Sequence, residues 1–177
     1  GLKSEKQKFE IILGAILTQN TAWKNVEKAI INLNEKDLID IEKLRNIDEK
    51  ELAQLIKPAG YYNQKARKLK VFVDYLVKNY NKSLKRLFNK PVKELREELL
   101  SIHGIGPETA DSIILYSAEK PIFIIDAYTR RIFFRIGLCK EDVSYDELQE
   151  MFMKNLEHDV DLFNEYHALI IEHGKNV

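Results

Sequence analysis

The stretch 103–109, HGIGPET, combines residue types suited to binding one phosphate group. Gly104 and Gly106 can adopt the positive φ angles of a sharp corner at little cost. A helix beginning at Pro107 would present its unbonded amides and the positive end of its dipole at that corner, where a phosphate oxygen can bind. A plain turn between two helices needs the same glycines. A dinucleotide loop is excluded because residue 109 is not glycine and no strand precedes it, and a P-loop because no Gly-Lys-Ser/Thr follows.

Asp126 follows the apolar run Ile122–Ile125, twenty residues after Gly106, and stands directly before AYTRRIFFRIG. An aspartate at the start of a helix accepts hydrogen bonds from backbone amides, a role worth about 1 kcal/mol. The same donors would keep the carboxylate ionised, because they favour its charged form. Asp126 is therefore expected to be a helix cap that carries a negative charge.

Helices must position these residues, because apolar side chains recur at helical spacing along almost the whole chain. Breaks are predicted at Gln19–Thr21, at Ile47–Asp48 and at Pro58–Gly60. Ser144 stands three residues before Glu147, the spacing of a capping box at a helix start. The short run Ile122–Ile125 is the only strand-like segment, and it has no partner. The sequence predicts an all-α protein.

The composition is that of an ordinary globular protein, with 45% hydrophobic and 32% charged residues. The apolar runs are too short to cross a membrane, and no signal peptide is evident. Cys139 is the single cysteine, which excludes a disulfide framework. The four histidines lack metal-ligand spacing, and His167 is interpreted as a packed or solvated residue. We expect an intracellular protein.

A formal net charge of zero conceals an uneven distribution along the chain. The segment 57–90 contains ten basic residues against one acid, whereas the segment from Glu141 to the end contains ten acids against two lysines. Such asymmetry suggests one face for an anion and another left in solvent, although lysine-rich helices also serve simply as soluble surfaces.

The order of these features resembles the helix-hairpin-helix (HhH-GPD) DNA glycosylase superfamily, which is named for a hairpin, a Gly/Pro-rich loop and an aspartate. The segments ILTQNT, GYYNQKARKL and GIGPETADSIILYSAEKPIFIIDAYTRRIF are similar to its endonuclease III branch, and the last most resembles the bacterial 3-methyladenine DNA glycosylases. The resemblance implies a two-lobed all-α fold with the active site in the cleft between the lobes. The expected division is a helical lobe over residues 1–119 and a C-terminal lobe over 120–177.

The resemblance also implies roles for individual residues. Asp126 would stabilise the positive charge that builds on C1′ when an N-glycosidic bond breaks. The residues expected to contact the DNA backbone are Gly104, Ile105, Gly106, Glu108, Thr109 and Arg130, with Arg131 and the 57–90 segment adding non-specific contacts. Those expected at the flipped base are Gln19, Asn20, Trp23, Tyr62 and Tyr128, with Tyr61 as a further aromatic candidate, and a core or surface role is open for each aromatic residue. Either Gln19 or Asn20 would fill the gap in the DNA, and which of the two stays open.

Glu108 occupies the position that matches the lysine of bifunctional relatives. A carboxylate cannot form the Schiff base of a lyase, and Lys120 lies too far along the chain to replace that lysine. The resemblance therefore implies a monofunctional enzyme that removes an N-alkylated purine such as 3-methyladenine and leaves an abasic site. The alternatives are an oxidised-base glycosylase with lyase activity and a non-catalytic DNA-binding module.

The remaining expectations concern cofactors, partners and location. The end of the chain, HALIIEHGKNV, resembles the helix that precedes a four-cysteine iron–sulfur loop, but one cysteine cannot complete such a site. We expect no cofactor and no metal, with a monovalent cation compatible with the hairpin. The expected partner is damaged double-stranded DNA, bound by a monomer in the nucleoid region of the cytoplasm, with no membrane involved.

Overall fold

The computed structural model describes residues 2–176, and within that range it contains helices and no strand. The elements in chain order are α1 (Glu5–Leu17), α2 (Trp23–Glu35), α3 (Ile41–Asn46), α4 (Glu49–Leu55), η1 (Lys57–Ala59), α5 (Tyr62–Tyr80), α6 (Leu84–Phe88), α7 (Val92–Ser101), α8 (Pro107–Ser112), η2 (Ile113–Ser117), α9 (Ala127–Arg135), α10 (Tyr145–Asn155) and α11 (Val160–Asn176). The all-α prediction is confirmed. The predicted breaks at Gln19–Thr21 and Ile47–Asp48 fall between helices, and the one at Pro58–Gly60 falls in the short 3-10 turn η1 between α4 and α5.

Several helices begin directly after a short polar side chain that accepts hydrogen bonds from backbone amides of the first turn. Ser144 begins α10 with a capping box, because its hydroxyl accepts from the amide of Glu147 while the Glu147 carboxylate accepts from the amide of Ser144. Ser4 and Gln7 form the same arrangement at α1. Pro107 occupies the first position of α8, as the sequence predicted.

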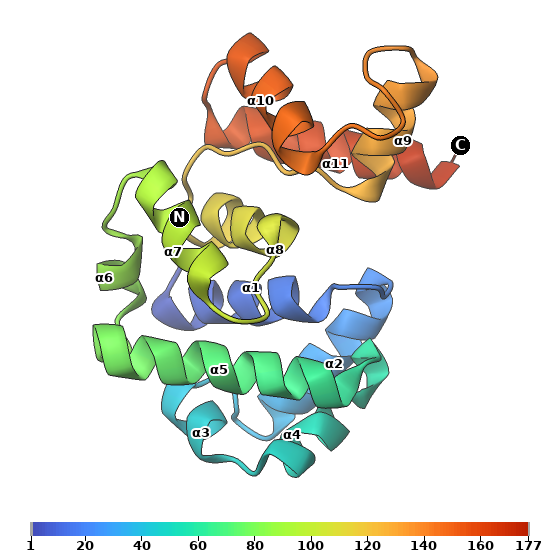
Figure 1. The fold of residues 1–177 in the computed structure, drawn as a ribbon. Coiled ribbons are helices and arrows are strands. Elements are labelled where there is room, and N and C mark those ends of the chain that lie inside the picture. Colours follow the sequence, from blue (N-terminus) through green and yellow to red (C-terminus); the bar gives the residue numbers. More distant parts are fainter. Residues whose placement is uncertain (1, 177) are drawn as a thin grey trace.

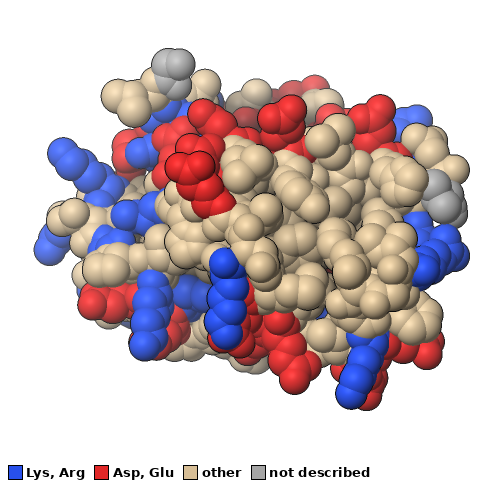
Figure 2. All heavy atoms as spheres, turned by 90° about the horizontal axis from the view of Figure 1, so that it is seen from above, with Lys and Arg blue, Asp and Glu red and all other residues tan. Residues whose placement is uncertain are grey.

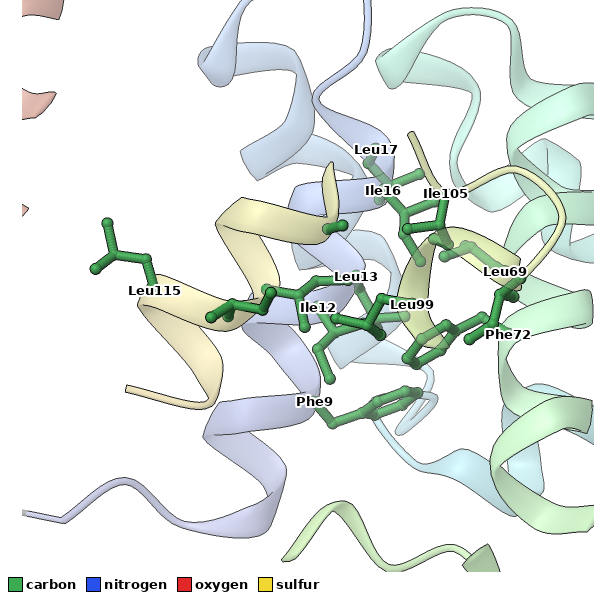
Figure 3. Packing of buried hydrophobic residues seen from close by; sticks show 14 of the residues in the cluster. Phe9, Ile12, Leu13, Ile16, Leu17, Leu69, Phe72, Leu99, Ile105 and Leu115 are labelled. Atoms are coloured by element: carbon green, nitrogen blue, oxygen red, sulfur yellow. The ribbon is translucent and has the colours of Figure 1, made fainter. Parts of the chain in front are cut away.

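Helix α1 lies at the centre of the larger lobe, between α5 below it and α8 above it in Figure 1. Most of its apolar residues are almost completely buried, and they pack with side chains from α5 and α7 (Figure 3). Ile105, from the hairpin between α7 and α8, lies beside Ile16 and Leu17 in the same cluster. The hairpin is therefore fixed to the core by an apolar side chain at its tip.

The smaller lobe consists of α9, α10 and α11, which lie above the rest in Figure 1. An extended and buried segment, Ile122–Ile125, leads into it, and Phe123 stacks on Phe152 with ring centroids 4.0 Å apart. The fold is thus two-lobed, as expected. The exact division at residues 119 and 120 stays a prediction.

A buried carboxylate joins the two lobes. Asp111 of α8 accepts a hydrogen bond from Arg96 Nε of α7 at 2.8 Å. Its other oxygen accepts from Tyr145 Oη at 2.7 Å and from Gln149 Nε2 at 2.8 Å, both on α10. Because Asp111 is fully buried and paired with donors from both lobes, it ties them together.

The helix after the hairpin changes its winding at Ile113. Over η2 the chain forms a π-helical turn, in which the amide of Ala118 donates to the carbonyl of Ile113, five residues earlier. Such turns are rare and occur often at functional sites. The apolar pattern of the sequence did not indicate this turn, because one extra residue shifts the spacing of apolar side chains at a single point of the helix.

The basic surplus of residues 57–90 is largely used within the fold. Lys65 is buried and donates to the carbonyls of Leu17 at 2.8 Å and Ala59 at 2.7 Å. The other members bonded internally are Lys68, Lys70, Lys78, Lys82 and Lys90. Six of the ten cations of this segment thus hold carbonyl or carboxylate groups of the protein itself, and the expected contacts of the segment with DNA stay a prediction. Seen from above in Figure 2, acidic side chains lie along the upper edge of the molecule, and others alternate with basic side chains along its lower edge.

Candidate active site

Asp126 is the N-cap of α9, as the sequence predicted. Its Oδ1 accepts two hydrogen bonds from Thr129, one from the backbone amide at 2.8 Å and one from the hydroxyl at 2.9 Å. The residue is only 8% exposed. Burial alone would raise the pKa of Asp126, but the hydrogen bonds from His167 and Thr129 outweigh it and lower the pKa. The carboxylate is therefore held in its ionised form inside the protein.

The chain just before Asp126 is held from behind by Tyr145. The amide of Ile125 donates to Tyr145 Oη at 3.2 Å, and the same hydroxyl donates to Asp111. Burial raises the pKa of Tyr145, so the hydroxyl keeps its proton. The buried junction between the lobes thus also fixes the backbone that presents the catalytic candidate.

His167 of α11 donates from Nε2 to Asp126 Oδ2 at 3.0 Å, and its Nδ1 lies 2.5 Å from the hydroxyl of Tyr116. His167 is only 8% exposed. The sequence interpretation was right that it is packed, but it missed this partner. Nothing in the local pattern could have revealed it, because the two residues are 41 positions apart.

Glu108 lies in the first turn of α8, close enough to Asp126 for the two charges to interact. The residue is exposed as a whole, yet surrounding atoms desolvate its carboxyl group and raise its pKa, and the negative charge of Asp126 adds to this effect. The positive charge of Arg130 acts in the opposite direction. The site therefore contains two carboxyl groups whose pKa values are moved apart, Asp126 downward and Glu108 upward.

The hairpin has the strained geometry that its glycines allow. Gly104 has a φ of +92°, whereas Gly106 is extended with a φ of −91°. The amide of Ile105 donates to the carbonyl of Ile102 at 3.1 Å. The role of Ile105 in the structure is thus to anchor the loop, and its contact with DNA stays a prediction, as do those of Gly104 and Gly106.

Gln19 and Asn20 are adjacent but differ in their environments. Gln19 accepts from Lys68 Nζ at 2.7 Å and donates to Thr109 Oγ1 at 3.1 Å, which ties the α1–α2 loop to the hairpin. Asn20 is exposed and has a φ of +54°. The structure therefore engages both ends of the Gln19 amide and leaves the side chain of Asn20 facing solvent.

Three aromatic residues expected at the flipped base, Trp23, Tyr62 and Tyr128, lie in different parts of the structure. Trp23 is 54% exposed, its ring packs against Gly14 and its Nε1 donates to Glu27. Tyr62 is half-buried at the start of α5. Tyr128 lies against Gly174 of α11, where an added Cβ would stand 2.5 Å from the tyrosine ring. Only Tyr128 is next to α11, the helix that carries His167, and the pocket role of all three stays a prediction.

The two arginines of α9 bond to the protein's own backbone. Arg130 donates to the carbonyl of Val143 at 2.9 Å, and Arg131 donates to the carbonyl of Gly174 while its guanidinium lies over the ring of Tyr128. These contacts brace the C-terminal lobe. Contacts of either arginine with DNA stay a prediction.

Metal ligands do not gather in the described part of the chain: within residues 2–176, no three histidine, cysteine or acidic side chains are placed to hold a metal ion. Cys139 is half-buried and cannot provide a four-cysteine cluster by itself. The expected independence from cofactors, and a monovalent cation at the hairpin, stay predictions. Between residues 2 and 176, no helix is both long enough and apolar enough to cross a membrane.

Comparison with known proteins agrees with this arrangement. Residues 13–158 match the model of the HhH-GPD superfamily of base excision DNA repair proteins. The chain belongs to this superfamily, and it is a DNA glycosylase of the helix-hairpin-helix class.

Three similar proteins illustrate the relationship. A protein of Methanocaldococcus jannaschii named as a DNA repair glycosylase is 51% identical over 95% of this chain and 77% of its own length. Endonuclease III of Sulfolobus acidocaldarius is 31% identical over 94% of this chain and 72% of its own length. The H. pylori 3-methyladenine DNA glycosylase MagIII, solved with 1,N6-ethenoadenine, is 31% identical, covers 98% of this chain and 89% of its own, and has a TM-score of 0.84.

Proposed function

We propose that this protein is a monofunctional DNA glycosylase that removes an N-alkylated purine, such as 3-methyladenine, from double-stranded DNA and leaves an abasic site. The observation that carries the proposal is the pair of carboxyl groups at the site. Asp126 is buried and ionised, and Glu108, in the first turn of α8, is the residue that the family resemblance matches to the Schiff-base lysine of bifunctional relatives. A carboxylate cannot form that imine, so this position supports hydrolysis without strand cleavage.

Asp126 acts electrostatically in this proposal. Breaking the bond between a sugar and a base builds positive charge on C1′, and a fixed carboxylate stabilises that charge in the transition state. Since Thr129 and His167 bond to both of its oxygens, Asp126 needs little reorganisation during the reaction. A second carboxyl group, Glu108, lies close enough to Asp126 for the two charges to interact.

The substrate class rests on two considerations. The similarity to the H. pylori 3-methyladenine glycosylase covers nearly the whole chain. In addition, an N-alkylated purine carries positive charge or a weakened glycosidic bond, and therefore leaves without strong acid catalysis. A site with one ionised carboxylate is sufficient for such a leaving group. Recognition then depends on aromatic stacking with the extruded base and on the energy of extrusion.

The DNA contacts in this proposal come from the hairpin and the α1–α2 loop. The amides around Gly104 and Gly106 would hold a backbone phosphate, and Asn20 would occupy the gap left by the extruded nucleotide. Gln19 is the less suitable candidate, because both ends of its amide are already bonded to Lys68 and Thr109. One chain supplies all of these groups, so the enzyme would act as a monomer.

Base release from a duplex containing 3-methyladenine tests the proposal. We expect the wild type to produce strand breaks only after hot alkali, and Asp126→Asn to produce none while it still binds the duplex. Breaks without alkali would identify a lyase, which is the alternative suggested by the endonuclease III relative. If the wild type released no base from a panel of alkylated and oxidised duplexes, the glycosylase proposal would be wrong for these lesions.

A further inference from the structure

A chain of two hydrogen bonds runs from Tyr116 through His167 to Asp126. The Tyr116 hydroxyl lies 2.5 Å from His167 Nδ1, and His167 Nε2 lies 3.0 Å from Asp126 Oδ2. The aspartate and the histidine are both almost fully buried, and the tyrosine is half-buried. The three residues come from η2, α11 and α9, so the chain exists only in the folded protein.

The chemistry of the groups fixes the direction of the bond to Asp126. An ionised carboxylate can only accept, so Nε2 of His167 must carry the hydrogen. With the imidazole neutral and its hydrogen on Nε2, Nδ1 is an acceptor, and the Tyr116 hydroxyl then donates to it. Burial raises the pKa of Tyr116 to about 12, so the tyrosine retains the proton that it donates. Tyr116 thereby selects the imidazole tautomer that can donate to Asp126.

The backbone around both partners fixes their positions. Gly174 of α11 lies directly against Tyr128 of α9, and Arg131 of α9 donates to the Gly174 carbonyl. These contacts fix how α9 and α11 are aligned along each other, and therefore where His167 lies relative to Asp126. On the other side, the π-helical turn η2 contains Tyr116 and packs against α11. Because the π-helical turn occurs at Tyr116, the residue that bonds to His167, the irregular winding suggests that the orientation of the Tyr116 side chain is functionally important.

We propose that Tyr116 and His167 form a positioning relay for the catalytic carboxylate, in which the hydroxyl orients the imidazole and the imidazole holds Asp126 Oδ2 in place. This inference rests on the proposed role of Asp126 as the catalytic group. His167 acts through Asp126, so it is a positioning residue. The relay leaves one aspartate oxygen bonded to Thr129 and the other to His167, and this fixes the plane of the carboxylate that faces the sugar.

The relay also determines the pH at which the carboxylate is charged. The titratable groups that act on Asp126 are His167 from α11, Tyr116 from η2 and Glu108 from α8, and the charge of Arg130 from α9 acts on Glu108. Burial raises the pKa of Asp126, and the bond from His167 is the strongest opposing influence. Without that donor, the pKa of Asp126 rises, the carboxylate becomes protonated at a higher pH, and the acidic limb of the rate profile moves to higher pH.

The first experiment compares single-turnover base release as a function of pH. We expect His167→Phe to reduce the rate at neutral pH roughly ten- to hundredfold, as loss of a hydrogen bond to a charged group does, and to shift the acidic limb to higher pH. Tyr116→Phe removes one oxygen, and we expect a smaller fall, roughly three- to tenfold, with a shift in the same direction. His167→Gln retains a side-chain N–H donor and should restore most of the rate. His173→Gln, at an exposed histidine of the same helix, is the matched control and should behave as wild type.

A second experiment does not depend on activity. The side-chain carboxyl carbon of Asp126, followed by NMR during a pH titration, should have a higher midpoint in His167→Phe than in wild type. If His167→Phe does not fold, the comparison is made with Tyr116→Phe. Equal midpoints, or an unchanged acidic limb in these variants, would overturn the relay. If the wild type releases no base, the proposed function fails, and the titration still decides the relay.

Discussion

Lys68 of α5 lies directly against Gly104 of the hairpin. A Cβ added at residue 104 would stand 2.5 Å from the lysine Cγ, and the φ of Gly104 is +92°. The same lysine donates from Nζ to Gln19 Oε1 at 2.7 Å. One side chain of α5 therefore supports both loops that are expected to touch DNA, and its fit depends on the absence of a side chain at residue 104.

The two hairpin glycines should respond differently to substitution by alanine. Gly104→Ala combines a positive φ with a steric overlap, so we expect the free energy of unfolding to fall by about 2 kcal/mol or more in urea denaturation. Gly106→Ala meets no atom within 4 Å and has an ordinary φ, so its stability should stay within about 0.5 kcal/mol of wild type. Its affinity for duplex DNA should fall if a phosphate approaches there. Equal stability losses at the two positions would contradict this assignment.

Asn20 and Gln19 can be separated by measuring stability and activity together. Asn20→Gly keeps the positive φ at this position, so we expect unchanged thermal stability and a lower rate of base release. Gln19→Ala breaks the bonds to Lys68 and Thr109 and should lower the free energy of unfolding by about 1 kcal/mol. If Asn20→Gly releases base as fast as wild type, another residue fills the gap in the DNA.

Replacing Glu108 with lysine should create a trappable enzyme. The substitution puts an amine at the position that the family resemblance matches to the lysine of lyases, close to the ionised Asp126. With borohydride and a duplex containing an abasic site, we expect a covalent complex for Glu108→Lys and none for wild type. Glu108→Gln, which has no amine, is the matched control. Trapping of the wild type would show that another lysine provides lyase chemistry.

Asp111 should be among the most sensitive polar positions in the chain. Asp111→Asn leaves the half-buried Arg96 without its buried partner, and removal of one member of a buried ion pair typically costs about 3 to 5 kcal/mol. The exposed Asp146 also contacts Arg96, at 3.3 Å, yet Asp146→Asn should change the free energy of unfolding by less than about 1 kcal/mol. Similar losses in both variants, measured by denaturant unfolding, would show that Arg96 rather than Asp111 is the essential group.

Local patterns in the sequence predicted the helices and several of their ends. Proline at the start of α8, the capping box at Ser144 and the cap at Asp126 depend on residues within a few positions of one another. For this reason they could be recognised without a structure. The resemblance to a known family led to the prediction of roles for Asp126 in catalysis and for Glu108 in the hairpin, and the structure brings the two carboxyl groups close enough for their charges to interact.

The remaining features depend on contacts between distant parts of the chain. Tyr116 and His167 are 51 positions apart, and Asp111 bonds to a glutamine 38 positions away. No periodicity encodes such pairs. The same limit applies to the basic segment, because a lysine such as Lys65 counts as surface charge until its carbonyl partners are known. Charge summed along a sequence cannot distinguish a lysine that holds the fold together from one that faces DNA.

The π-helical turn at Ile113–Ser117 has a consequence for how this site can change during evolution. It holds one residue more than an α-helical turn, so deletion of a single codon there would restore regular winding. Each residue of an α-helix turns the chain by about 100°, and the deletion would therefore rotate Tyr116 away from His167. A lineage could lose or regain the hydroxyl behind the aspartate through one three-nucleotide insertion or deletion, without any substitution at Tyr116, His167 or Asp126.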